Sequence, residues 1–276
     1  MISKLKKKAI AIMMMLAMTA SLVFVIGPAE VNAASGYKMP SRIKTYKYED
    51  GKWTKTNDRK FRYDSKGNLT NWDGEVLKLK YNGSKLKKVT VLAMKNTPDE
   101  CYTTKTYDSK GNISKLVYDY TEFGKVTVTY KYDKKGYIRT WTWNVMGEKN
   151  VEKYDIKYYA NGMPKQITMT TNYNNEKIIE NFNKNGFCSS SKTYDGKKLM
   201  KSYTVSFKMS GNMIKSCVEN YKIRDGKKTN YKWKYVYTYG NAKVKDQKQY
   251  AAFMSMTHDT FLFRTVGNNS AVGWCH

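Results

Sequence analysis

The sequence predicts an all-β fold: an antiparallel meander of β-hairpin repeats that builds one large curled or layered sheet, with a short C-terminal helix as its cap. Three observations predict this fold. A turn motif containing an aromatic residue and a glycine recurs along most of the chain. The segments between the turns alternate apolar and polar side chains, as strands with one buried face do. The last segment loses that alternation.

The repeat consists of an aromatic residue, three turn residues, a glycine and an apolar residue two positions further on. From Gly111 onward, successive glycines of the motif lie 25, 26, 24 and 25 residues apart. Asp or Asn starts such a turn by bonding to its own backbone, and the glycine adopts the positive φ that closes it. The structural positions of the repeats are Tyr63, Gly67, Tyr107, Gly111, Tyr132, Gly136, Tyr158, Gly162, Phe182, Gly186, Phe207 and Gly211.

A second kind of turn separates the repeats, as at Asp50-Gly51-Lys52 and Asp195-Gly196-Lys197. Each repeat therefore contributes two strands and two turns, as in a chain of hairpins. A sheet of roughly a dozen or more such strands cannot stay flat, because strand twist accumulates. We expect the sheet to curl on itself, to fold into two packed layers or to be capped.

The N-terminal segment, residues 1–33, has the layout of a secretory signal peptide. A lysine cluster precedes the apolar run Ala9–Ile26, and the small-residue site Val31-Asn32-Ala33 follows. An uncleaved membrane anchor is the alternative. No second apolar run of spanning length follows, so we expect no transmembrane segment after cleavage. The mature chain is expected to be secreted and extracellular, or held non-covalently at the cell surface.

The rest of the chain divides into a linker (34–41), the repeat domain (42–245) and a C-terminal capping segment (246–276). The capping segment includes a short helix over Asp246–Met256. The helix is expected to place its apolar residues on one side. These residues are Tyr250, Phe253 and Met254.

The chain is strongly basic, with a formal net charge of +27. The predicted signal carries away four lysines and one glutamate, which leaves +24 on the mature chain. Such a field attracts polyanions: anionic polysaccharide, teichoic acid, nucleic acid or anionic lipid. In the alternative interpretation, the lysines only keep a large sheet soluble and block edge pairing, and the protein acts through a protein partner. Composition does not decide between these, or fix the oligomeric state.

Catalytic and metal-binding patterns are missing from the sequence. The two histidines, His258 and His276, lack the spacing of metal ligands, and no cofactor motif occurs. Most aspartates sit at turns, which explains them without catalysis. An exported glycoside hydrolase is a less favoured alternative, since it requires converging carboxylates. The four cysteines can form disulfides or pack as free thiols, and their pairing stays open: Cys101, Cys188, Cys217 and Cys275.

Aromatic residues beside lysines are the one binding signal. They could stack on sugar rings while the lysines meet acidic groups. The candidate binding residues are Lys232, Lys234, Trp233, Tyr235, Tyr237, Trp141, Trp143 and Lys131. The competing interpretation is that the aromatics form the buried face, because they share the phase of core positions. The lysines that alternate with them then form the wet contact face.

The motifs that start at Tyr63 and Tyr107 resemble YD repeats, the units of RHS-type surface and toxin-associated proteins. The resemblance covers residues 42–243 and implies an exported β-sheet array that serves as a shell or binding surface. This chain is too short for the large enclosing shell of the toxin members. A second resemblance, to choline-binding cell-wall repeats, rests on the segment from Tyr158 to Met163. These repeats lack that family's Gly-Trp lead, and a basic surface repels a cation such as choline.

The sequence therefore predicts a non-enzymatic secreted or cell-surface β-repeat protein that binds anionic cell-wall or extracellular polymers. A scaffold module of toxin-associated or adhesin type, acting through a protein partner, is the alternative. The exported hydrolase is the third.

Overall fold

The computed structural model describes residues 36–256 except 66–67, 84, 94–99, 110–111, 121–123, 146, 225–228 and 245–246. The predicted signal peptide, both histidines, Cys275 and the repeat glycines Gly67 and Gly111 lie outside the described residues.

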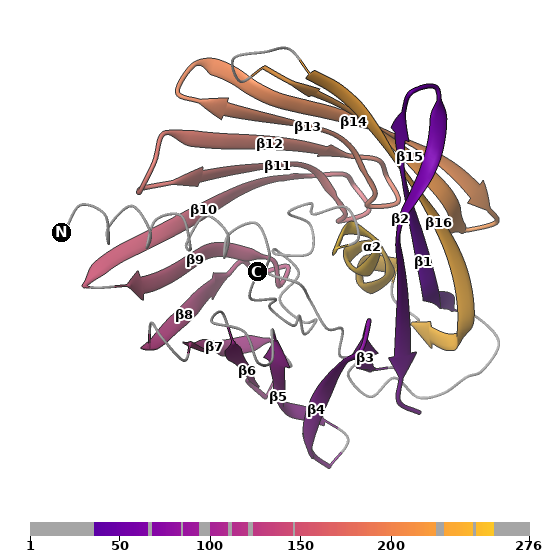
Figure 1. Cartoon of the computed structure of the whole chain (residues 1–276). Coiled ribbons are helices and arrows are strands. Elements are labelled where there is room, and N and C mark those ends of the chain that lie inside the picture. Colours follow the sequence, from indigo (N-terminus) through magenta and orange to yellow (C-terminus); the bar gives the residue numbers. More distant parts are fainter. Residues whose placement is uncertain are drawn as a thin grey trace.

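The described residues form sixteen antiparallel strands that close into a barrel (Figure 1). Neighbours in the wall follow the order of the sequence, so the predicted hairpin meander is confirmed. The strands are β1 (Tyr37–Glu49), β2 (Lys52–Tyr63), β3 (Leu69–Trp72), β4 (Glu75–Asn82), β5 (Lys85–Ala93), β6 (Cys101–Tyr107), β7 (Ile113–Tyr120), β8 (Gly124–Tyr132), β9 (Ile138–Val145), β10 (Glu148–Tyr158), β11 (Pro164–Thr171), β12 (Glu176–Phe182), β13 (Cys188–Asp195), β14 (Lys198–Ser210), β15 (Met213–Ile223) and β16 (Thr229–Val244).

Closure by β1 and β16 makes the sheet a barrel, which refines the expectation of a large curled sheet and corrects the alternative of two packed layers. The two strands pair from Tyr37, opposite Val244, to Tyr48, opposite Lys232. Closure is the solution that leaves no unpaired edge, and accumulated twist brings the first and last strands together. A second correction concerns the linker. Residues 37–41 belong to β1 and therefore to the wall.

The predicted turn chemistry is confirmed in the repeats that start at Tyr132 and Phe182, whereas the three turn residues predicted before Gly211 belong to strand β14. The Asp133 carboxylate accepts hydrogen bonds from the backbone N–H of Lys135 and of Tyr137, both at 2.9 Å. Gly136 closes that turn with a φ of 75°. Two repeats later, the Asn183 side chain accepts the equivalent two hydrogen bonds, from the backbone N–H groups of Asn185 and Phe187. Because each repeat has two strands, all turns of this kind fall at one end of the barrel.

The predicted alternation is also confirmed, and it separates an apolar inner face from a polar outer face. On β8, Val126 and Val128 are buried, whereas Thr127 and Thr129, which alternate with them, are exposed. The inner side chains form one core cluster along the wall. Closing the sheet turns this face inward, and among the described strands no second sheet packs on it.

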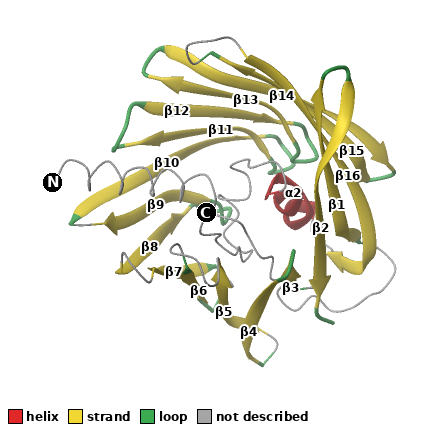
Figure 2. Ribbon diagram, viewed as in Figure 1, coloured by secondary structure: helices red, strands yellow, loops and turns green. Residues whose placement is uncertain are grey.

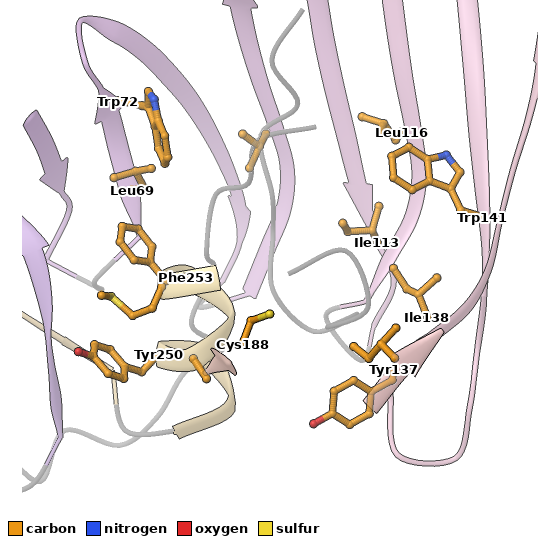
Figure 3. Packing of buried hydrophobic residues seen from close by; sticks show 14 of the residues in the cluster. Leu69, Trp72, Ile113, Leu116, Tyr137, Ile138, Trp141, Cys188, Tyr250 and Phe253 are labelled. Atoms are coloured by element: carbon orange, nitrogen blue, oxygen red, sulfur yellow. The ribbon is translucent and has the colours of Figure 1, made fainter. Parts of the chain in front are cut away.

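Helix α2 (Gln247–Met256) lies inside the ring of strands near β1 and β16 (Figure 2). Tyr250 stacks on Tyr37 at 4.9 Å, and Phe253 meets Phe61 edge-on at 5.8 Å. Figure 3 shows both side chains projecting from the helix, with Phe253 toward Leu69. The predicted helix and its apolar side are thus confirmed, and the helix fills the end that carries the Asp133-type turns. Within the described part of the chain, no helix is long and apolar enough to cross a membrane.

Candidate binding surface

The barrel wall divides the predicted binding residues between its two faces. Trp233, Tyr235 and Tyr237 share the inward phase of β16, whereas Lys232 and Lys234 alternate with them on the outside. Trp141 and Trp143 are only 7% exposed and pack 5.9 Å apart in the core. Aromatics and lysines therefore do not form one site. The lysines are the members that face outward, together with Lys131 on β8.

Lysines and threonines form a row across the outer face, which we call the lysine row. Its three lysines are exposed and lie on every second strand. With strands about 4.8 Å apart, neighbouring lysines of the row are about 10 Å apart at the backbone. The paired positions, from β8 to β12, are Lys131, Thr140, Lys153, Thr170 and Lys177.

A cluster of outward aromatics, the aromatic shelf, lies where β16, β1 and β2 meet. It consists of Tyr46, Tyr48 and Trp53. Tyr48 is 36% exposed, and its ring centroid is 5.1 Å from that of Trp53. The sequence analysis missed this cluster, although the phase of β1 could have revealed it. Ile43 points inward, so Tyr46 and Tyr48 are out of phase with the core.

Two of the predicted lysines pack on this shelf. The ammonium of Lys234 lies 4.9 Å from the Trp53 ring and 5.1 Å from the Tyr46 ring. The ammonium of Lys232 lies 5.4 Å from the Tyr48 ring. Cation–π attraction holds each charge beside an aromatic face at the surface. The shelf thus combines exposed ring surface with two positive charges.

An ion pair fixes the strands beneath the shelf. Arg42 on β1 donates from Nε and Nη2 to the two carboxylate oxygens of Asp58 on β2, at 2.5 and 2.7 Å. These hydrogen bonds hold the pKa of Asp58 well below its usual range. Two-point contact of this kind restricts the relative orientation of the two side chains, and so supports the register of the β1–β2 pair.

Three buried glutamates line the inside of the barrel: Glu152, Glu180 and Glu219. Glu219 accepts hydrogen bonds from the hydroxyls of Tyr221 at 2.8 Å and Tyr235 at 3.2 Å. Buried carboxylates need such partners, and tyrosines supply them here. The sequence analysis did not find these residues. In the sequence, each could have been found as a carboxylate at an inward position of a strand, as Glu180 is between Ile178 and Phe182.

Metal and thiol chemistry find no support in the described residues. Among them, no group of three or more His, Cys, Asp or Glu side chains is placed to hold a metal ion. Cys101 is disulfide-bonded, whereas Cys188 and Cys217 are buried and take no part in a disulfide. Burial raises the pKa of the Cys188 thiol well above its ordinary value. A thiol in that state is a poor nucleophile.

A shallow depression of about 560 Å³ lies on the outer face of β4 to β6. Val76 and Tyr102 line it and are 63% and 48% exposed. Tyr102 is thus an outward aromatic on a different part of the wall from the shelf, which makes it a matched reference for the shelf residues.

No protein-family model and no curated protein sequence matches the chain. Among solved structures, the chain is similar to one described as a porin-like protein from Bacteroides uniformis. The identity is 13% and the TM-score 0.53, over 73% of this chain and 96% of that one. A structure of TcdB2-TccC3-TEV also aligns, at 13% identity and a TM-score of 0.30, over 67% of this chain and 13% of that one. At 13% identity, the similarity to the porin-like protein shows only that the two chains share a barrel fold.

Proposed function

We propose that the protein is a non-enzymatic, exported β-barrel that binds anionic cell-wall or extracellular polymers through the outer face of its wall. The lysine row is the observation that carries this function. Lys131, Lys153 and Lys177 present charges at a regular spacing across five neighbouring strands. A linear polyanion laid across the strands meets these charges in succession.

The chemistry of the outer face suits contact with water and polymer rather than lipid. A barrel wall in a bilayer needs an apolar outward band, and a lysine at mid-membrane costs about 2–4 kcal/mol. Here many outward positions in the middle of strands carry charged or hydroxylated residues, such as Thr129 and Lys153, and the aliphatic residues among them, such as Val117, do not form a continuous band. This supports a secreted or surface-held protein, in agreement with the signal layout of residues 1–33.

The overall charge reinforces the local pattern. With the predicted signal removed, +24 remains on the chain. Charges of one sign add to a long-range field that concentrates anionic polymers near the wall and speeds their association. That field weakens with ionic strength, because the Debye length is about 10 Å at 0.1 M salt.

Co-sedimentation of the secreted chain with teichoic acid, an acidic polysaccharide and DNA over a salt series tests the function. The decisive variant changes the three lysines of the row to glutamine. The matched control changes Lys78, Lys80 and Lys88, which are also exposed and outward, on β4 and β5. Both variants lose the same net charge.

We expect the row variant to bind more weakly than the control. We also expect its slope of log K against log salt to fall by up to about three, one unit per lysine. Equal losses in the two variants would show that the row has no special role. No binding by the unmodified chain at low salt would refute the function itself.

A further inference from the structure

A second outward row, on β11 to β15, carries amides and hydroxyls instead of charges. Cross-strand pairing places these residues opposite one another on five consecutive strands. We call them the polar track: Gln166, Asn181, Ser190, Thr204 and Asn220. Lysines stand at both ends. Lys157 on β10 is paired with Gln166, and Lys232 on β16 is paired with Asn220.

The track continues directly into the aromatic shelf. Lys232 is paired with Tyr48 on β1, and Tyr48 with Trp53 on β2. The register therefore connects a line of hydrogen-bonding groups to an exposed aromatic surface. With strands about 4.8 Å apart, the nine positions from Lys157 to Trp53 span about 38 Å of wall.

The side chains of the track are ordered by one another. Gln166 Nε2 donates to Asn181 Oδ1 at 2.9 Å, and Asn181 Nδ2 donates to Ser190 Oγ at 3.1 Å. Each amide has two N–H donors and an oxygen with two lone pairs, so one such bond uses only part of its capacity. The track is thus a pre-arranged line of donors and acceptors, which lowers the entropy cost of binding a polar ligand.

Positive charges flank the track on both sides. On the side of the track that faces the Asp195–Gly196 turn, the next outward row contains Lys192 and Lys222. Both lysines are paired with Ser202 of β14. On the other side, Lys234 lies on the shelf. The complementary ligand is a polymer that is rich in hydroxyls and also carries anionic groups at intervals.

We propose that the polar track and aromatic shelf form a binding subsite for an acidic polysaccharide laid across the strands. The amides and hydroxyls bond the sugar hydroxyls, and the rings of Tyr48 and Trp53 stack on sugar faces. The flanking lysines meet carboxylate or sulfate groups. Polyphosphate gains from the lysines alone, because it offers the track no sugar hydroxyls.

This subsite deepens the proposed function and rests on it. The test compares polygalacturonate with inorganic polyphosphate, which carries charge without sugar rings, by isothermal titration at one ionic strength. One variant combines Asn181→Ala with Asn220→Ala, and the other is Trp53→Ala. The controls are Thr104→Ala with Thr129→Ala, and Tyr102→Ala, which remove two outward polar side chains and one outward aromatic ring from other strands.

The track and shelf variants are expected to bind polygalacturonate at least tenfold more weakly and polyphosphate unchanged, while the controls match the unmodified chain for both ligands. Methyl-esterified polygalacturonate, which keeps the hydroxyls and loses the charge, is expected to bind weakly and to retain the dependence on Trp53.

The subsite is overturned if the variants leave polygalacturonate binding intact or weaken both polymers equally, whereas the proposed function then survives. Absence of binding to every polyanion refutes both. Thermal melts monitor folding. If the double asparagine variant does not fold, Trp53→Ala and its conservative partner Trp53→Phe decide the outcome, since the phenylalanine retains stacking.

Discussion

At the scale of single residues, a lysine occupies a position on the inner face where the alternation predicts an apolar side chain. Lys105 lies on β6 between Thr103 and Tyr107 in the inward phase and is 3% exposed. Burial lowers the pKa of its ammonium well below the ordinary value. The charged form is therefore the disfavoured one in the folded barrel, and Lys105 opposes folding at neutral pH.

Replacing Lys105 with methionine, which keeps a similar volume, is expected to stabilise the barrel by about 1–3 kcal/mol at pH 7. The sign follows from proton binding. The unfolded chain holds the Lys105 proton more tightly than the folded chain does, so this lysine's contribution to stability improves as pH rises toward its ordinary pKa. Urea unfolding at pH 7 and pH 9 measures both effects. A destabilised Lys105→Met protein would show instead that the amine makes a structural contact.

At the scale of elements, the Asp133 turn shows how one side chain defines a hairpin. Its carboxylate accepts two backbone N–H bonds and also the hydroxyl of Tyr158 from the next repeat. Asn183 occupies the same place in another repeat and makes the same two backbone bonds. Turn formation therefore requires an oxygen at this position and not a charge.

Asp133→Ala is expected to cost about 1–3 kcal/mol of unfolding free energy, because two partly buried donors, the Tyr137 N–H and the Tyr158 hydroxyl, lose their acceptor. Asp133→Asn is expected to recover most of that loss, since its amide oxygen accepts the same N–H groups. Chemical denaturation of the two variants makes the comparison. If Asn behaves like Ala, the charge of Asp133 matters rather than its turn geometry.

Local chemistry accounts for much of what could be predicted at this scale. The spacing of the Gly136-type turns, the alternation on β8 and the apolar side of α2 all depend on nearby residues, and all were readable. The polar track was not, and neither was the meeting of the shelf residues on β1 and β2 with the lysines of β16, because both depend on which residues face each other across strands. The phase of β1 shows only that Tyr46 and Tyr48 face outward. That register becomes visible only when the strands are paired, as with Tyr48 between Lys232 and Trp53.

Closure belongs to the scale of the whole molecule and has no local signal. No residue of β1 specifies β16 as its neighbour; their pairing results from twist summed over the strands between them. Closure also turns the meander's two faces into an inside and an outside. It packs most of the tyrosines inside the barrel together with Glu152, Glu180 and Glu219, and it leaves most of the lysines on one continuous convex wall.

The lysines of that wall are expected to have opposite effects on stability and on binding as salt increases. Like charges repel one another in the compact barrel, so screening favours the folded state. Raising salt from 0.01 to 0.1 M shortens the Debye length from about 30 to about 10 Å. The melting temperature of the unliganded chain is therefore expected to rise over this range, while affinity for an acidic polymer falls.

A thermal melt at each salt concentration, with and without polygalacturonate, measures both trends on one sample. The polymer binds the folded barrel, so it should raise the melting temperature most at 0.01 M and progressively less as salt weakens binding. The two melting curves should converge at high salt. A melting temperature that does not respond to salt would mean that anionic groups already compensate the lysines locally, and the polymer's effect should then vanish as well. The chain with the three row lysines changed to glutamine provides the internal comparison. Its lysines repel one another less and it binds the polymer more weakly, so its melting temperature should depend less on salt and on the polymer.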